Sequence, residues 1–420
     1  MPFGLAVVLG GSIGSGILRT PGPVAAALPN PRLLILLWLF GGVLAFIEAL
    51  PLIELATALP RTGGAIVYVE RAFGHIAGTL AGWCSWLQCV ISLAFMAVVF
   101  AEFAQRLGTH APVGLMAVGL IVTITALNLS DTRTSGWGQM IGAVVKLLGL
   151  LALIALLFAV PPAPQVSHPP GSALSLGGAV IALLLVNNTY QGWSALVPFV
   201  EEMRDPTRTM ARAMFVGLAI ITVIYVGMNV ALLRALPFAT LAHSTLPAGD
   251  AMARVVGPLA DRVITALSLI SVVAIANLTT MLPARILLAM ARARSAPAVF
   301  GRIGSNGSPY AATLAVGLVA GVLASSGAYI ALNAMYAPLA ILTTIAVMLA
   351  AWRLRRTEPT LPRPVRMPGH PVPVVVALTV NIAMLVAFVA TSPLEALGSV
   401  GLVALGMPLL LLSQRKQSGG

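Results

Sequence analysis

The sequence predicts an all-α integral membrane protein with twelve transmembrane helices, and its composition and the length of its apolar segments both favour this fold class. Of the 420 residues, 59% are hydrophobic and 9% are charged, whereas a soluble domain carries about 25% charged residues. A chain so poor in charge cannot cover a water-facing surface. Apolar segments near the roughly 20 residues that a membrane helix needs recur along almost the whole length.

The twelve expected spans are joined by short connections, so residues 1–420 are expected to form one domain. The longest gaps, 161–174, 234–261 and 353–371, leave no room for a separate soluble domain. The spans are placed at 4–28, 33–57, 77–104, 113–129, 137–160, 175–198, 213–233, 262–290, 311–326, 329–352, 372–391 and 395–413. The first apolar run opens at Phe3 without a basic leader, so no cleavable signal peptide is expected.

Arginine and lysine are distributed unevenly between the two sets of gaps. With the N-terminus placed in the cytoplasm, the inside holds seventeen of the 24 residues and the outside six, and Lys146 lies within a span. The positive-inside rule therefore predicts cytoplasmic N- and C-termini in the cell inner membrane. The net charge of +12 does not indicate nucleic acid, because the arginines lie in short gaps and form no basic stripe.

The sequence offers little support for an enzyme, a metal protein or a channel. Cys84 and Cys89 share one apolar span and are expected to act as small hydrophobic side chains rather than as a disulfide or a metal pair. The five histidines lie outside the spans or at their ends, without an H-E-x-x-H or paired-carboxylate motif. No filter loop repeats along the chain. We therefore expect no catalytic residue, metal or cofactor.

The first span contains the segment GGSIGSGIL at 10–18, in which four of nine residues are glycine. Each glycine inside a helix costs roughly 0.8–1 kcal/mol relative to alanine, so a continuous helix is disfavoured. One alternative is a small-residue face for helix packing. The other is an unwound break that frees the backbone N–H groups of Ser15 and Gly16, which suit a carboxylate.

The sixth span holds a second interruption, the polar run VNNTYQGW at 186–193. Polar groups at this depth either join helices by hydrogen bonds or line a cavity. Interruptions in the first and sixth spans occupy corresponding positions of two five-helix repeats, and such a pair is the best sequence indication of a substrate site at mid-membrane. The expected repeats are 4–160 and 175–352, followed by two additional helices within 372–413.

Lys146, Glu48, Glu54 and Glu102 are charged residues within or at the ends of the expected spans. Lys146 either extends to the membrane surface or is a fixed cation that joins the fifth span to the first-span break. Glu54 either serves a cytoplasmic gate or caps the inside loop, and Glu102 is expected at the outer interface. No role is assigned to Glu48.

Five motifs in order resemble the amino acid–polyamine–organocation (APC) superfamily, closest to its L-type and bacterial amino acid permease branches. The resemblance covers nearly the whole chain. The motifs are GGSIGSGI at 10–17, EL-x4-PRTGGAIVYVERAFG at 54–74, Lys146, YQGWSALVPFVEEMRDPTR at 190–208, and Asn277 with Arg285.

The resemblance implies a 5+5 inverted-repeat fold with two extra helices. It also implies that backbone N–H groups of Gly14, Ser15 and Gly16 bind a substrate α-carboxylate. Backbone carbonyls at Ile13, Asn188 and Gln191, beside Gly192, would bind the α-amino group. Lys146 matches the lysine that replaces sodium in sodium-independent members. Gating is assigned to Asn188, Tyr190, Trp193 and Glu54.

Two departures from the family pattern affect these expectations. Asn188 stands where an aromatic residue usually closes over the substrate. Residues 105–112 contain no cysteine, so no disulfide-linked partner subunit is expected.

The expected function is sodium-independent transport of amino acids across the lipid bilayer by alternating access, through exchange or proton coupling. Since 10–18 and 186–194 contain no Asp or Glu, neutral amino acids are favoured, small or polar ones slightly. An exporter of amino acids or related amines is the alternative.

Overall fold

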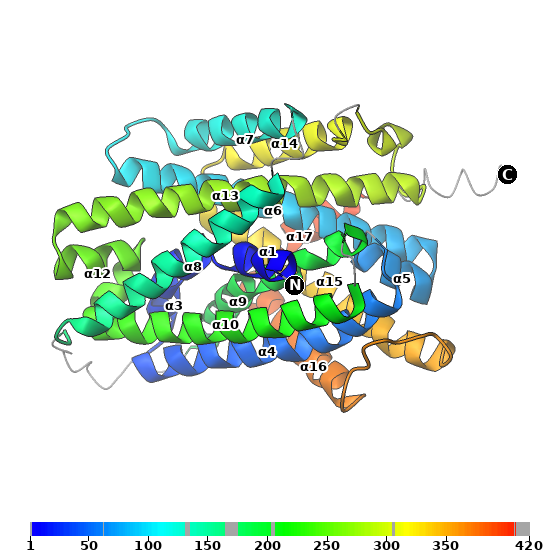
Figure 1. The fold of residues 1–420 in the computed structure, drawn as a ribbon, viewed down its shortest axis with the longest axis horizontal. Coiled ribbons are helices and arrows are strands. Elements are labelled where there is room, and N and C mark those ends of the chain that lie inside the picture. Colours follow the sequence, from blue (N-terminus) through cyan, green and yellow to red (C-terminus); the bar gives the residue numbers. More distant parts are fainter. Residues whose placement is uncertain are drawn as a thin grey trace.

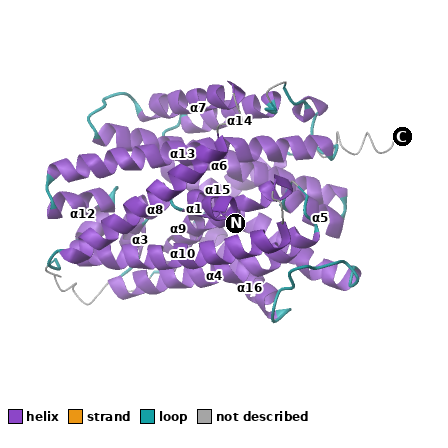
Figure 2. Cartoon of the chain, in the orientation of Figure 1, coloured by secondary structure: helices purple, strands orange, loops and turns teal. Residues whose placement is uncertain are grey.

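The computed structural model describes residues 2–61, 63–130, 135–163, 175–202, 206–304, 307–406 and 408. Every regular element in these ranges is a helix, as predicted (Figure 2). The helices α7 and α14 lie side by side along one edge of the ribbon, α4 and α10 lie along the opposite edge, and α1 lies between them (Figure 1).

Six helices in the described ranges are long and apolar enough to cross a membrane. They are α4 (Pro31–Ala58), α6 (His75–Arg106), α10 (Pro206–Ala235), α13 (Pro258–Arg292), α15 (Tyr329–Thr357) and α16 (Val372–Thr391). The remaining helices are α1 (Pro2–Ser12), α2 (Ser15–Arg19), α3 (Pro21–Ala27), α5 (Ala65–Phe73), α7 (Val113–Ser130), α8 (Ser135–Ala159), α9 (Leu176–Tyr190), α11 (Phe238–His243), α12 (Pro247–Val255), α14 (Tyr310–Ala324) and α17 (Pro393–Ala404), with the 3-10 helices η1 (Gln191–Glu202) and η2 (Ala298–Gly301). Several of these are shorter apolar helices, and the count of twelve spans stays a prediction.

Large apolar side chains cover the outside of the bundle. Val223 of α10, Leu318 of α14 and Ile330 of α15 are 73%, 70% and 82% exposed. In water such a surface would be costly, whereas lipid tails are as apolar as these side chains. The exposed surface therefore agrees with a membrane protein.

The first and sixth expected spans are each divided in the structure. The segment 4–28 forms α1, α2 and α3, because Gly14 is extended (φ −157°, ψ −155°) between α1 and α2. The sixth span differs from the expectation of an unwound segment: α9 runs to Tyr190 and continues as the 3-10 helix η1 from Gln191. At 12 residues, η1 is longer than most 3-10 helices.

Buried aromatic residues fasten the two interruptions to the neighbouring helices. The Tyr225 hydroxyl of α10 lies within hydrogen-bond distance of the carbonyl oxygens of Ser12 and Thr189, one from each interruption. Trp38 of α4 packs against Tyr190 and Tyr225, with ring centroids 6.0 and 5.6 Å away. This cluster fixes the interruptions relative to each other.

Ion pairs lie at the ends of the helices, and each joins residues that the sequence assigns to the same side. On the predicted outside, Arg106 pairs with Asp250 and Asp261. On the predicted inside, Arg71 pairs with Glu358 at 2.9 Å. Four residues assigned to the inside, Arg133, Arg204, Arg415 and Lys416, lie outside the described residues, as does the end of the last expected span.

Candidate functional site

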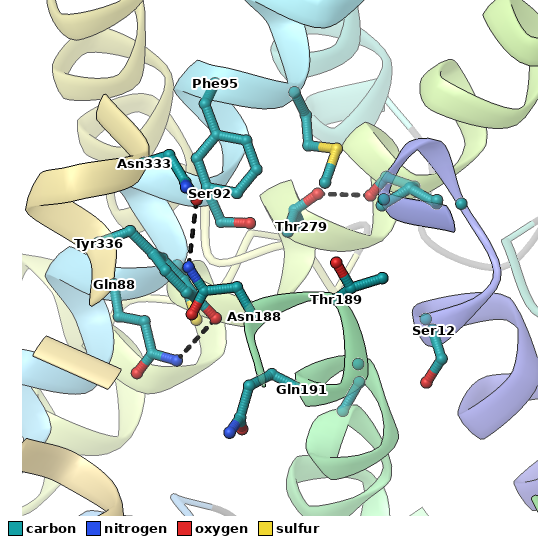
Figure 3. A pocket seen from close by; sticks show the side chains of 18 of the residues that line it. Ser12, Gln88, Ser92, Phe95, Asn188, Thr189, Gln191, Thr279, Asn333 and Tyr336 are labelled. Atoms are coloured by element: carbon teal, nitrogen blue, oxygen red, sulfur yellow. Dashed lines mark hydrogen bonds between the residues drawn. The ribbon is translucent and has the colours of Figure 1, made fainter. Parts of the chain in front are cut away.

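A cavity of about 160 Å³ lies between the break in the first span and η1. The segment from α1 to α2 contributes Gly11, Ser12, Gly14 and Gly16, and helices α6, α13 and α15 form the other walls. Figure 3 shows polar side chains from these elements turned toward the cavity.

Glycine allows the two interruptions to approach each other. A Cβ atom on Gly192 would lie 2.3 Å from the carbonyl oxygen of Gly11, and one on Gly16 would lie 2.9 Å from Thr189 Cγ2. A Cβ atom on Gly14 would lie 1.9 Å from Ile275 Cδ1 of α13. Larger residues at these positions would separate the elements that form the cavity.

Neutral hydrogen-bonding groups dominate the polar part of the wall. The Asn188 side-chain amide donates to Asn333 Oδ1 at 3.2 Å, and the Gln88 amide donates to the Tyr336 hydroxyl at 3.2 Å (Figure 3). The buried Ser12 Oγ has no hydrogen-bond partner within the described part of the chain. These groups can bind a polar, uncharged molecule or a zwitterion.

Sequence reasoning missed the wall that comes from the long helices. The missed polar residues are Gln88 and Ser92 of α6, Thr279 of α13, and Asn333 and Tyr336 of α15. Each lies within an apolar span, Thr279 directly before Thr280. A polar residue in an apolar span is the only local signal, and it does not say which helix face turns inward.

An ion pair involves the charged residue of the cavity wall. Arg19, counted with the outside residues in the sequence, is the last residue of α2 and lines the cavity. Its guanidinium lies 2.8 Å from the Glu102 carboxylate and 3.5 Å from the centre of the Tyr329 ring. The pair neutralises the one positive charge among the lining residues.

A second cavity of about 160 Å³ adjoins the first, and we call it the inner cavity. Gln88, Gln191 and Ser194 line both cavities. The inner cavity continues to Gly63 and Gly64, before α5, on the predicted cytoplasmic side. Its wall also includes Glu48, Ser85, Trp193, Thr343 and Thr344.

The predicted site residues fall into two groups. Gly14, Gly16, Asn188, Gln191 and Gly192 line the first cavity, and Trp193 lines the inner cavity. Of the others, Ser15 is the first residue of α2, and Ile13 is buried beside α8. The Tyr190 hydroxyl donates to the Trp38 carbonyl, and Glu54 is held in an ion pair.

Lys146 and Glu54 lie away from the first cavity. Lys146 of α8 borders a separate apolar cavity of about 170 Å³, together with Ile13 and Gly14, and therefore lies beside the first-span break. Glu54 binds Arg355 and Arg363 and accepts a hydrogen bond of 2.6 Å from the Met367 backbone N–H. These contacts join α4 to the connection between α15 and α16.

The sequence is similar to a family of amino acid permeases and to known amino acid transporters. The sequence profile of a family described as amino acid permease matches residues 5–406. A serine/threonine exchanger of Bacillus subtilis is 30% identical over 247 residues, which cover 56% of this chain and 54% of the exchanger. The b(0,+)-type amino acid transporter 1 of Rattus norvegicus is 28% identical over 405 residues, which cover 93% of this chain and 82% of that protein. The match to the exchanger thus spans about half of the exchanger's length.

Proposed function

Because the chain belongs to the amino acid permease family, we propose that it carries neutral L-amino acids across the cytoplasmic membrane by alternating access, without sodium. The observation that carries the proposal is the cavity between the two helix interruptions. Its lining combines apolar side chains with several polar ones, and among the described lining residues the one charged side chain is Arg19, which Glu102 neutralises.

The interruptions supply groups suited to both ends of an amino acid. The extended backbone at Gly14 interrupts the helical hydrogen bonding between α1 and α2, so N–H groups from Gly14 to Gly16 are available for a carboxylate. The unpartnered Ser12 Oγ is an acceptor for an ammonium group. These contacts involve the atoms that all amino acids share, so selectivity falls to the rest of the wall.

The wall favours an uncharged side chain of modest size. Arg19 and Glu102 satisfy each other, and a charged substrate side chain buried beside them would lack its own partner. A cavity of about 160 Å³ admits a small amino acid more readily than an aromatic one. The name of the Bacillus relative, a serine/threonine exchanger, supports small polar substrates.

Sodium independence rests on Lys146. Its position beside Ile13 and Gly14 puts an ammonium group close to the first-span break. A fixed cation there would take the part that a sodium ion plays in sodium-coupled relatives.

Counterflow in proteoliposomes tests the proposal. Vesicles loaded with unlabelled serine should take up labelled serine, with alanine and threonine as effective competitors and with arginine and glutamate as weak ones. Uptake should be the same in sodium and in potassium buffer. Best competition by arginine or glutamate would show that the charge argument is wrong, and a sodium requirement would remove the role of Lys146.

A further inference from the structure

Glu48 is a buried carboxylate in the interior of α4. It is 2% exposed and lines the inner cavity. The side-chain amide of Asn381, from α16, donates a hydrogen bond of 2.7 Å to Glu48 Oε1. Gln191 lines the same cavity as Glu48.

No basic side chain in the described chain pairs with Glu48. The helices α3 and α16, which pack on α4, carry no titratable side chain. The three arginines of α10, Arg208, Arg212 and Arg234, lie within its first two turns or at its end. On α9 and α10, Tyr190 donates to the Trp38 carbonyl and Tyr225 to the Ser12 carbonyl. On α15, Tyr336 accepts a hydrogen bond from Gln88, Tyr329 lies under Arg19, Arg355 binds Glu54, and Arg353 and Arg356 lie over the rings of Phe73 and Trp352. The side chains of Glu201 and Glu202 in η1 lie outside the described ones.

An unpaired carboxylate at this depth is costly. The desolvation of one buried ion costs several kcal/mol unless a counter-charge or a proton neutralises it. Asn381 Oδ1 is buried, has no hydrogen-bond partner among the described residues, and is therefore an unused acceptor beside Glu48. A protonated carboxyl group can donate a hydrogen bond, whereas a carboxylate can only accept. The surroundings of Glu48 thus suit a proton better than a permanent negative charge.

We propose that Glu48 is the proton-binding site through which transport is coupled to a proton, an inference that rests on the proposed function. Gln191 connects substrate binding with proton binding, because it lines both the substrate cavity and the inner cavity, where Glu48 lies. Glu48 takes a proton from water when its cavity faces one side of the membrane and returns it to water on the other side. With a zwitterionic substrate, one net positive charge crosses in each cycle.

The inner cavity offers a route for that proton. It extends from Glu48 to Gly63 and Gly64 on the predicted cytoplasmic side. The buried Ser85 Oγ and Trp193 Nε1, both from its wall, have no hydrogen-bond partner among the described residues. A cavity of this size that offers several unpartnered polar groups can admit water, which can carry a proton to the carboxyl group.

The test uses full-length protein in vesicles that contain a pH-sensitive dye. Addition of an amino acid that supports counterflow should move protons with the wild-type protein. In Glu48→Gln, the side-chain oxygen of glutamine can still accept the hydrogen bond from Asn381, but the side chain cannot ionise. We expect this variant to retain counterflow, while substrate-dependent proton movement and uptake driven by a pH gradient fall to the level of protein-free vesicles. Glu358→Gln, which removes a carboxylate from the exposed pair with Arg71, is the matched control and should retain both.

Each other outcome has a definite meaning. Proton movement that persists in Glu48→Gln overturns the inference, as does wild-type counterflow without proton movement. Loss of counterflow in a folded variant would make Glu48 a substrate-binding residue instead. Wild-type protein that exchanges no amino acid at all would refute the proposed function itself.

A measurement on the wild-type protein covers the case in which the variant does not fold. Dicyclohexylcarbodiimide reacts with protonated carboxyl groups in apolar surroundings, and mass spectrometry locates the adduct. Labelling of Glu48 at acidic pH that declines as the pH rises supports the inference. Absence of labelling across the pH range contradicts it.

Discussion

At the first-span break, Gly14 lies against a side chain of a distant helix. Its closest neighbour across the break is the end of the Ile275 side chain, which an added Cβ atom would approach to 1.9 Å. The contact joins the break to α13, so the two elements set the shape of the substrate cavity together.

Gly14→Ala should therefore destabilise the protein by about 1 kcal/mol, the lower end of the usual cost of overpacking, because the atom that must move is the end of a flexible side chain. Removal of Ile275 Cδ1 by Ile275→Val should recover most of this loss in the double variant, although Ile275→Val alone costs about 0.5–1.5 kcal/mol. Thermal unfolding of the purified protein and substrate binding measure both effects. Gly119→Ala is the control, because nothing lies within 4 Å of an added Cβ atom there. Equal effects at positions 14 and 119 would show that the contact with Ile275 does not matter.

The sequence predicted the first break because glycine density is a local property. Four glycines in nine residues weaken a helix wherever it lies. The contact of Gly14 with Ile275 was not predictable, since it joins residues distant in the chain. Glu48 was likewise left without a role, because only its packing beside Asn381 and the inner cavity distinguishes it from other carboxylates.

At the scale of elements, the sequence predicted the long apolar helices well and their rotation poorly. The helix α6 is apolar nearly all round, so its periodicity does not show that Gln88 and Ser92 face the cavity. The second interruption was predicted as unwound from its polar residues, yet backbone hydrogen bonds persist as η1 begins at Gln191. Inside a membrane bundle, retaining those bonds is less costly than leaving them open.

The junction of α4 with the connection after α15 depends on Glu54. This side chain is 3% exposed and binds Arg355, Arg363 and the Met367 backbone N–H. Glu54→Gln leaves two arginines without their counter-charge, so we expect a loss of about 3–5 kcal/mol in the free energy of unfolding. Chemical denaturation in detergent measures the loss.

The pair between Arg71 and Glu358 is the matched comparison for Glu54. The Arg71 side chain is 58% exposed. Glu358→Gln should cost only about 0–1 kcal/mol, because exposed ion pairs contribute little. If the two glutamine variants lose equal stability, burial of the Glu54 pair is not what fixes α4.

At the scale of the whole molecule, the two interruptions meet at the centre, where Gly11 and Gly192 are in contact. We propose that 4–160 and 175–352 are inverted repeats around this point. Five spans are an odd number of membrane crossings, so the second repeat would begin on the opposite side of the membrane from the first. The end that holds Arg71 and Arg355 would then be cytoplasmic, and the end that holds Arg106 would be external.

Cysteine labelling tests this orientation in intact cells. In a background without Cys84 and Cys89, we expect His110→Cys, in the exposed connection between α6 and α7, to react with a membrane-impermeant maleimide. Thr360→Cys, in the exposed connection between α15 and α16, should react only after the membrane is permeabilised. The two positions lie seven expected spans apart, and an odd number puts them on opposite sides. The reverse labelling pattern would invert the orientation. Reaction at both positions in intact cells would instead require an even number of crossings between them, and that result would contradict the predicted spans themselves.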